Sequence, residues 1–263
     1  MYLSSDLIKK NLIYFIPFFL VFSIFLAELF ILGTVIIFVY YQIRNKEYKI
    51  FFNKYFIFFL FFWCFLLINS LFSYNLNLSF SKSLPYIRFG ILFLVISHML
   101  NSKYFKNNFL KYTLILLIIV CLDAIIQFSF GRNILGYEAH VSRISSFFKD
   151  ELVLGGFLLR MYPIFLISII YFKKKFSINT FLVSFILFIY FLAIYLSGER
   201  TAFFNFIVLN IFLLIILFKK KNIKYLLSFV LILPLTFILV NKHNDEISAR
   251  YLSVKEIFNN KTP

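Results

Sequence analysis

The stretch "FLVSFILFIYFLAIYLSGERTAFFNFIVLNIFLLIILF", Phe181–Phe218, holds two long apolar runs separated by the short segment Ser197–Arg200. Each run approaches the length of about 20 residues that a helix needs to cross the hydrocarbon core of a bilayer. The stretch therefore predicts two membrane helices joined by a tight turn. A polar turn needs no charged side chain, so the acid Glu199 beside the guanidinium of Arg200 asks for a further explanation.

Apolar runs of this kind recur along the whole chain of 263 residues, of which 62% are hydrophobic and 14% charged. A soluble domain carries about 25% charged and 45–50% apolar residues. The runs are too long and too numerous for a signal peptide, and none shows the alternation of a membrane β-barrel. The predicted fold class is all-α, a polytopic transmembrane helical bundle. The apolar segments are 12–42, 55–73, 85–100, 112–130, 152–172, 177–196, 201–218 and 225–240.

The first apolar segment, 12–42, is too long for one ordinary membrane span. Glu28 lies near its middle, so we predict two short helices that meet at Ala27-Glu28 and form an N-terminal hairpin. With this hairpin the lysine-rich loops all fall on the cytoplasmic side, as basic loops should. The sequence then predicts about nine membrane helices in a single integral membrane domain, 1–263. The N-terminus would be cytoplasmic, and 241–263 would lie outside as the start of a loop.

The net charge of +16 is explained by orientation signals, so we expect no nucleic-acid partner. The predicted cytoplasmic loops hold fifteen Lys and one Arg, whereas the rest of the chain holds five Lys and six Arg. Guanidinium binds phosphate or carboxylate through a planar fork, whereas ammonium acts as a point charge. The outer side is therefore predicted to hold an anion. The six arginines that lie outside or within the membrane are Arg88, Arg132, Arg143, Arg160, Arg200 and Arg250.

The segment Ser197–Arg200 admits two readings. In one, Ser197 is the N-cap of a helix that starts at Gly198, where the free backbone N–H groups and the helix dipole favour an anion. Arg200 adds a directed charge there, and Glu199 orients it or acts as a base. In the other reading, Arg200 extends to the membrane interface and pairs with its neighbour. The sequence leaves both open.

A second stretch, "RISSFFKDELVLGGFLLR", Arg143–Arg160, runs from a predicted outer loop into the next span. Asp150 and Glu151 stand at the expected start of that helix, where acids suit the helix dipole, so we predict a capping role for them. Gly155 and Gly156 permit close approach of the backbone, either to another helix or to a ligand.

Charged side chains inside the apolar runs are costly in lipid and should face a partner or a water-filled cavity. Arg160, Arg88 and Asp123 are of this kind, and we predict a salt bridge between Asp123 and one of the two arginines. Cys64 and Cys121 lie inside apolar runs, so the sequence predicts no disulfide framework, metal site or cofactor.

Together, "SGERTAFF", "RISSFFKDELVLGGFLLR" and "LPYIRFG" resemble the O-antigen ligase and polymerase family of bacterial inner-membrane glycosyltransferases. The resemblance extends along the whole chain but over only the front two thirds of a typical member. It implies a metal-independent transferase with its active face in the periplasm. Such an enzyme moves a glycan from undecaprenyl pyrophosphate to an acceptor sugar, such as the lipid A core in lipopolysaccharide biosynthesis. The choice between ligase and polymerase stays open, because the acceptor decides it.

The resemblance also implies roles for the outer arginines, as ligands of the lipid pyrophosphate. Arg200 matches the motif arginine, Arg143 opens the second stretch, and Arg250 lies near the start of the family's large periplasmic loop. The predicted substrate-binding residues are Arg200, Arg143, Arg250, Arg160 and Arg88. The expected partners are the glycan donor, the lipid A core or another glycan acceptor, and membrane lipids.

The catalytic base is the least determined part of the prediction. The family's catalytic histidine lies late in the periplasmic loop, whereas His243, in "KHNDEI", lies soon after a span. His243 and Glu199 are the candidate catalytic residues. Because the chain ends at Pro263, early in that loop, we expect an incomplete or inactive member. The alternative is a transporter or a lipid- or anion-binding protein with an arginine-lined cavity. The prolines, however, do not show the paired, broken helices typical of transporters.

Overall fold

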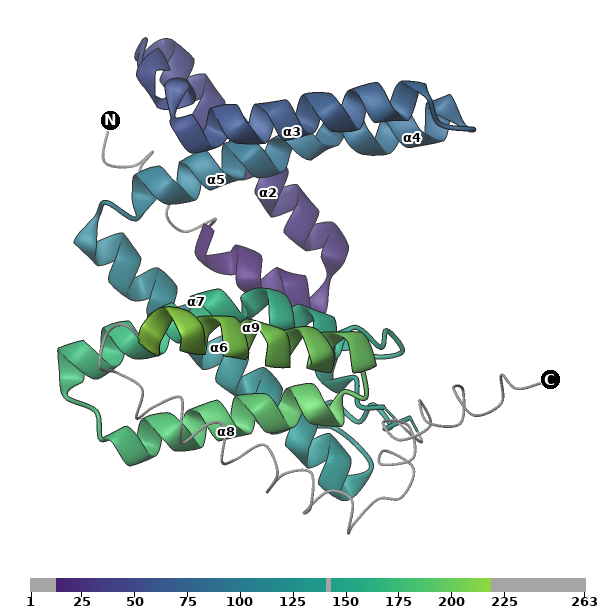
Figure 1. Cartoon of the computed structure of the whole chain (residues 1–263), viewed down its shortest axis with the longest axis vertical. Helices are drawn as coiled ribbons and strands as arrows, with labels where there is room; N and C mark the ends of the chain where they lie inside the picture. The colour runs from purple at the N-terminus through teal and green to yellow at the C-terminus, as the bar shows by residue number, and fades with distance from the viewer. Residues whose placement is uncertain (1–12, 141–142, 219–263) are drawn as a thin grey trace. The chain divides into compact units, whose positions relative to one another are not determined.

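The computed structural model describes residues 13–140 and 143–218, with side chains as far as residue 213 (Figure 1). Within these ranges the chain forms helices and no strand, which confirms the all-α fold class. The elements are a short helix Ile13–Phe22, α2 Ile24–Arg44, η1 Tyr48–Phe52, α3 Lys54–Leu71, α4 Leu76–Ser83, η2 Leu84–Tyr86, α5 Ile87–Met99, α6 Lys103–Phe130, η3 Ser146–Phe148, α7 Leu154–Phe176, α8 Thr180–Leu196 and α9 Arg200–Phe218.

Five of the described helical stretches are long and apolar enough to cross a membrane: α2, α3, the stretch Leu76–Met99, α6 and α7. The helix Ile13–Phe22, α8 and the part Arg200–Leu213 of α9 are apolar too, but shorter. Even the 17 residues of α8 rise about 25 Å, close to the thickness of a hydrocarbon core. Several apolar helices thus mark a membrane protein. The count of nine helices and the hairpin remain predictions, and the segment 225–240 lies outside the described residues.

The N-terminal apolar run breaks at Ser23. This residue has an extended backbone with φ −161°, and its side chain accepts a hydrogen bond from the N–H of Leu26 at 3.4 Å as the N-cap of α2. The break predicted at Ala27-Glu28 is therefore wrong. Glu28 needs no chain break because Arg88 of α5 pairs with it, which lets α2 continue past the charge.

The chain divides into two compact units, Met1–Tyr112 and Thr113–Pro263, and each is described by itself. In the first unit α2 and α5 run parallel, since Glu28 meets Arg88 at one end and Phe38 lies by His98 at the other. α3 runs antiparallel to α5 and packs closely on it, because a Cβ at Gly90 would overlap the ring of Phe59. The single integral domain stays a prediction.

Between α4 and α5 the helix tightens into η2 at Pro85, which has no N–H to donate to the preceding turn. The indole Nε1 of Trp63, on α3, donates to the carbonyl of Ser83 at 3.1 Å. A neighbouring helix thus satisfies a backbone group at the break, as a membrane setting requires.

In the second unit α7 and α9 run parallel and α8 runs antiparallel to α7 (Figure 1). Tyr162 of α7 donates its hydroxyl to Oδ1 of Asn210 on α9 at 2.6 Å. Tyr190 of α8 donates to the carbonyl of Leu158 at 2.5 Å and stacks on Phe165 with ring centroids 3.9 Å apart. Buried aromatic rings whose polar groups are all satisfied therefore hold these three helices together.

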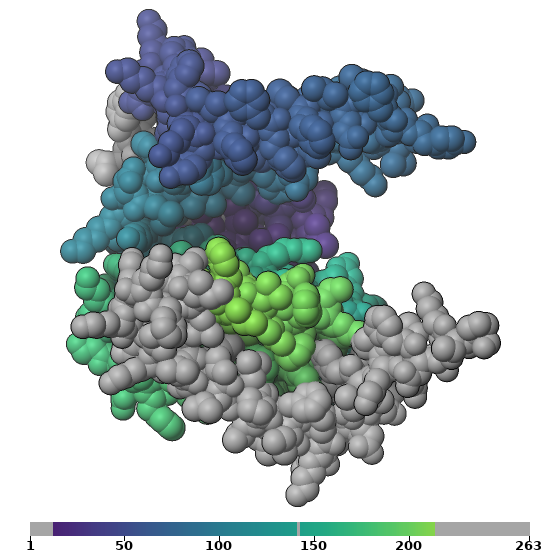
Figure 2. All heavy atoms as spheres, in the orientation of Figure 1, coloured from purple at the N-terminus to yellow at the C-terminus, as the bar shows by residue number. Residues whose placement is uncertain are grey.

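Large apolar side chains remain exposed along the helices, and α3 shows this most clearly. α3 packs against α4, and in the space-filling view this part of the chain presents an extended surface (Figure 2). The exposed fraction of Phe58 on α3 is 77%, and Phe61 and Phe65 are similar. Soluble monomers rarely expose apolar patches of this extent. These helices therefore indicate contact with membrane lipid.

Candidate functional site

The turn between α8 and α9 consists of Ser197, Gly198 and Glu199. Ser197 closes α8 as its C-cap, and its buried hydroxyl donates to the carbonyl of Ile194 at 2.6 Å. Gly198 has φ +66°, a left-handed conformation that glycine adopts without strain and that reverses the chain. The N-cap role predicted for Ser197 is wrong, because this reversal delays the start of α9 until Arg200.

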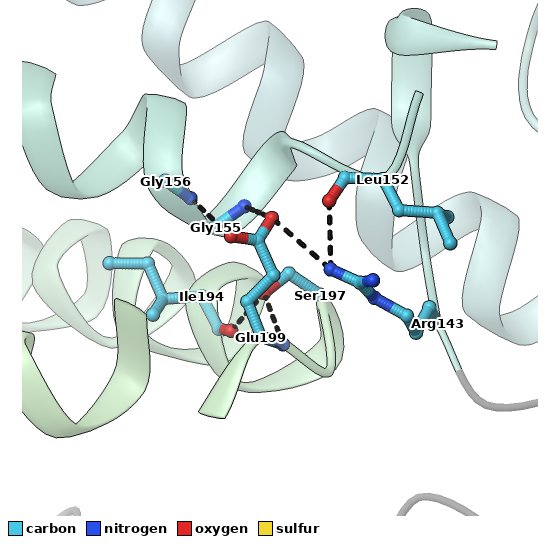
Figure 3. Close-up of polar contacts among 7 residues, drawn as sticks. All are labelled: Arg143, Leu152, Gly155, Gly156, Ile194, Ser197 and Glu199. Atoms are coloured by element: carbon cyan, nitrogen blue, oxygen red, sulfur yellow. Dashed lines mark hydrogen bonds and ion pairs between the residues drawn. The ribbon is translucent and has the colours of Figure 1, made fainter. Parts of the chain in front are cut away.

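Glu199 points away from its own helix toward the start of α7 (Figure 3). Its Oε1 accepts the backbone N–H of Gly155 at 2.9 Å, and its Oε2 accepts that of Gly156 at 3.0 Å. The first N–H groups of a helix lack partners within it, and a carboxylate there also suits the dipole. The acid that caps α7 therefore comes from the α8–α9 turn. The capping role predicted for Asp150 and Glu151 is wrong, since both are exposed ahead of the helix.

The two glycines make this contact possible. A Cβ at Gly155 would collide with Oγ of Ser197 and lie 3.0 Å from Cβ of Glu199. A Cβ at Gly156 would lie 3.3 Å from Oε2 of Glu199, a tight contact. The predicted close approach of the backbone at this glycine pair is thus confirmed, and the neighbour is the α8–α9 turn.

Arg143 reaches the same point from the loop that joins α6 to α7. Its Nη2 donates to the carbonyl of Leu152 at 2.8 Å and lies 3.7 Å from Oε1 of Glu199 (Figure 3). The side chains of Arg143 and Glu199 are 20% and 14% exposed. The Nε of Arg143 is buried and has no hydrogen-bond partner among the described residues. Arg143 and Glu199 thus form a mostly buried ion pair with unused donor capacity on the guanidinium.

Arg200, the first residue of α9, is half-buried directly beside Glu199. The structure therefore brings two predicted site residues, Arg143 and Glu199, together at the start of α7, and Arg200 follows Glu199 in the chain. Arg160 lies further along α7 and is exposed, and the structure records no hydrogen bond or ion pair for it within residues 13–140 and 143–218.

Two predicted ion-pair partners prove to have other contacts. Arg88 belongs to the other unit, where its Nη2 lies 2.8 Å from both carboxylate oxygens of Glu28. Asp123 is fully buried and pairs with neither arginine, so the predicted salt bridge is wrong. Its carboxylate accepts hydrogen bonds from the Ser146 hydroxyl at 2.6 Å and the Ile134 N–H at 3.0 Å, because the loop after α6 folds back over it.

The remaining candidates cannot be placed. His243 and Arg250 lie outside the described residues, so the catalytic role of His243 and the substrate-binding role of Arg250 stay predictions. Among the residues that the structure does describe, no three His, Cys, Asp or Glu side chains form a group that could hold a metal.

The sequence did not point to Gln127 and Asn133, two buried polar residues that order the loop after α6. A glutamine within an apolar run is itself a signal, since a polar group in a membrane helix needs partners.

No protein-family model, curated protein or solved structure matches this chain.

Proposed function

We propose that this chain is an O-antigen ligase-like glycosyltransferase of the bacterial inner membrane, acting on an undecaprenyl-pyrophosphate-linked glycan at the periplasmic face. The observation that supports the proposal best is the position of Arg143, whose Nη2 lies 3.7 Å from Oε1 of Glu199 at the start of α7, with Arg200 following Glu199 as the first residue of α9. The guanidinium of Arg143 meets the N-terminus of α7 there, and α9 begins with Arg200 directly after Glu199, so we expect the local field to favour an anion.

The orientation of the helices agrees with a periplasmic location of these arginines. α7 ends in Lys173–Lys175, at the opposite end from Arg143 and Arg200. In the other unit, α2 ends at Arg44 and the parallel helix α5 ends just before Lys103. Basic loops mark the cytoplasmic side of a membrane protein, so the arginine end of the second unit faces outward in this proposal.

The proposed reaction needs an anion-holding group and a base. The hydroxyl oxygen of the acceptor sugar attacks the anomeric carbon of the glycan, and the bond from that carbon to the pyrophosphate oxygen breaks. The electron pair leaves with undecaprenyl pyrophosphate, whose growing charge a guanidinium fork stabilises. The proton of the hydroxyl passes to a base, for which His243 is the candidate. In this proposal Glu199 is a structural residue that joins the α8–α9 turn to α7 and pairs with Arg143. It is not the base, because both of its oxygens already accept hydrogen bonds.

The test measures donor binding and glycan transfer by the full chain in lipid nanodiscs. If Arg200 binds pyrophosphate through its fork, Arg200→Lys should weaken donor binding nearly as much as Arg200→Ala, by a factor of about ten or more. Arg132→Ala is the matched control, since it removes an exposed arginine of the loop after α6 whose ion pair contributes little.

Each outcome is informative about the class of protein. Full donor binding by Arg200→Lys would show that Arg200 does not bind pyrophosphate through the planar fork of its guanidinium. Donor binding without transfer to any acceptor is the outcome expected of an inactive member, and the alternative, a lipid- or anion-binding protein, shares it. No donor binding at all would exclude the glycosyltransferase. Transfer that is lost in His243→Ala would identify the base.

A further inference from the structure

Gln127 of α6 ties together both arms of the loop between α6 and α7. Its side chain is fully buried. The Oε1 atom accepts the backbone N–H groups of Ser145 at 3.1 Å and Ser146 at 2.6 Å. The Nε2 atom donates to the carbonyls of Tyr137 at 3.2 Å and Glu138 at 3.3 Å. An amide side chain has two donor hydrogens and two acceptor positions, so Gln127 uses its full capacity on this loop.

One turn earlier on α6, Asp123 holds the same loop. In addition to its bond with the Ser146 hydroxyl, its Oδ2 accepts a hydrogen bond from Nδ2 of Asn133 at 3.3 Å. Ser146 has φ +53°, which is uncommon for a residue other than glycine. Such a conformation persists only where its surroundings over-determine it. The contacts from Asp123 and Gln127 provide that restraint.

Arg143 is thus held at both ends of its side chain. Its backbone lies two residues before Ser145, which Gln127 fixes, and its guanidinium is bound by the carbonyl of Leu152 beside Glu199. A free arginine side chain samples many rotamers. Holding both ends removes much of that freedom before any ligand arrives.

We propose that Gln127 is a positioning residue, which sets where the Arg143 guanidinium lies by anchoring the loop that carries it. The functional part of this inference rests on the proposed binding of an anionic donor by Arg143. The geometric part does not, since it concerns only the link between Gln127 and Arg143. Gln127 and Arg143 are not neighbours in the sequence, and the folded loop links them.

The sharpest perturbation is Gln127→Glu, which keeps the shape of the side chain and replaces its NH2 donor with an oxygen. That oxygen would face the carbonyls of Tyr137 and Glu138, so the loop should detach from α6. Ser146→Ala is a milder second variant, because it removes only the hydroxyl contacts with Asp123 and the carbonyl of Val120 and keeps the backbone bond to Gln127.

The first measurement is the rate at which phenylglyoxal modifies each arginine of the purified chain in nanodiscs, read by mass spectrometry. We expect Arg143 to react at least about tenfold faster in Gln127→Glu, and faster to a smaller degree in Ser146→Ala. Arg132 is already 68% exposed, and Arg88 lies in the other unit, so their rates should not change. An unchanged rate at Arg143 in both variants would overturn the proposal. An equal rise at Arg88 would show general unfolding and would also overturn it.

The second measurement is a double-mutant cycle on binding of undecaprenyl-pyrophosphate glycan. Gln127→Glu should weaken binding about tenfold in the natural chain and less than about twofold in Arg143→Ala, because its effect passes through that arginine. Equal losses in both backgrounds would mean a general structural role and would overturn the proposal. A natural chain that binds no donor refutes the proposed function, while the arginine-modification rates still decide whether Gln127 positions Arg143.

Discussion

Glu199→Ala should open the first turn of α7, because it removes both acceptors that Gly155 and Gly156 use. The two hydrogen bonds measure 2.9 and 3.0 Å, and the carboxylate is only 14% exposed, so water replaces it poorly. A hydrogen bond to a charged group contributes about 1.5–3 kcal/mol. Since the two bonds are not additive, we expect the variant to lose about 3 kcal/mol of local stability. This corresponds to a factor of about 150 in the opening equilibrium.

Amide hydrogen exchange measures this opening directly. The assay follows peptides that contain residues 154–157 in the purified chain in nanodiscs. Glu199→Gln keeps one carbonyl oxygen and loses the charge, so its exchange rate should lie between those of Glu199→Ala and the natural chain. Glu151→Gln is the matched control, since Glu151 is an exposed acid shortly before α7. Its exchange rate should equal that of the natural chain.

Two results would refute the reasoning. Equal exchange at residues 154–157 in Glu199→Ala and the natural chain would show that the carboxylate does not cap α7. An acceleration in Glu151→Gln as large as that in Glu199→Ala would show that any nearby acid serves, through the helix dipole alone. In that case the link from the α8–α9 turn to α7 would have no special importance.

Three further predictions concern packing and orientation. Gly155→Ala should lower the stability of the α7–α9 unit by about 1–3 kcal/mol, seen as a lower Tm in detergent, whereas Gly33→Ala, where the added Cβ meets nothing within 4 Å, should not. Trp63→Phe should cost about 1–3 kcal/mol by leaving the carbonyl of Ser83 without its donor, which thermal unfolding of the chain would detect. A cysteine at Asn259 should react with an impermeant thiol reagent added from the periplasmic side, and reaction only after inner-membrane lysis would reverse the proposed orientation.

Much of the helical architecture follows from the sequence, because a membrane helix needs a long apolar run and the chain shows these runs plainly. The ends of the helices are harder to predict from the sequence. Ser23 breaks the first run through its capping hydroxyl, while the more conspicuous Glu28 does not, since Arg88 neutralises it. A charge in an apolar run therefore indicates a partner as readily as a break, and the sequence does not say which.

The candidate site was predictable as a set of residue types but not as a set of contacts. The sequence marks Glu199 and Arg143 by their charge and Gly155 and Gly156 by their lack of side chains, but it does not show the contacts among them. The link joins segments more than forty residues apart, from Gly155 to Glu199. Local rules of capping favour an acid near the start of a helix in sequence, so they pointed to the wrong acid.

The question raised by an acid beside an arginine has a physical answer in this geometry. Without Glu199, the guanidinium of Arg143 and the positive end of α7 would repel each other in a poorly hydrated place. The carboxylate offsets part of that repulsion and fixes α7 to the turn before α9. A single negative charge cannot neutralise Arg143 together with the N-terminus of α7 and the Arg200 that follows in the chain, so this place keeps a net positive charge. Under this account Glu199→Gln should bind an anionic donor less well despite its gain in net positive charge, because Arg143 loses the ion pair that holds it at the start of α7. Tighter donor binding by Glu199→Gln would instead mean that the acid only opposes the anion.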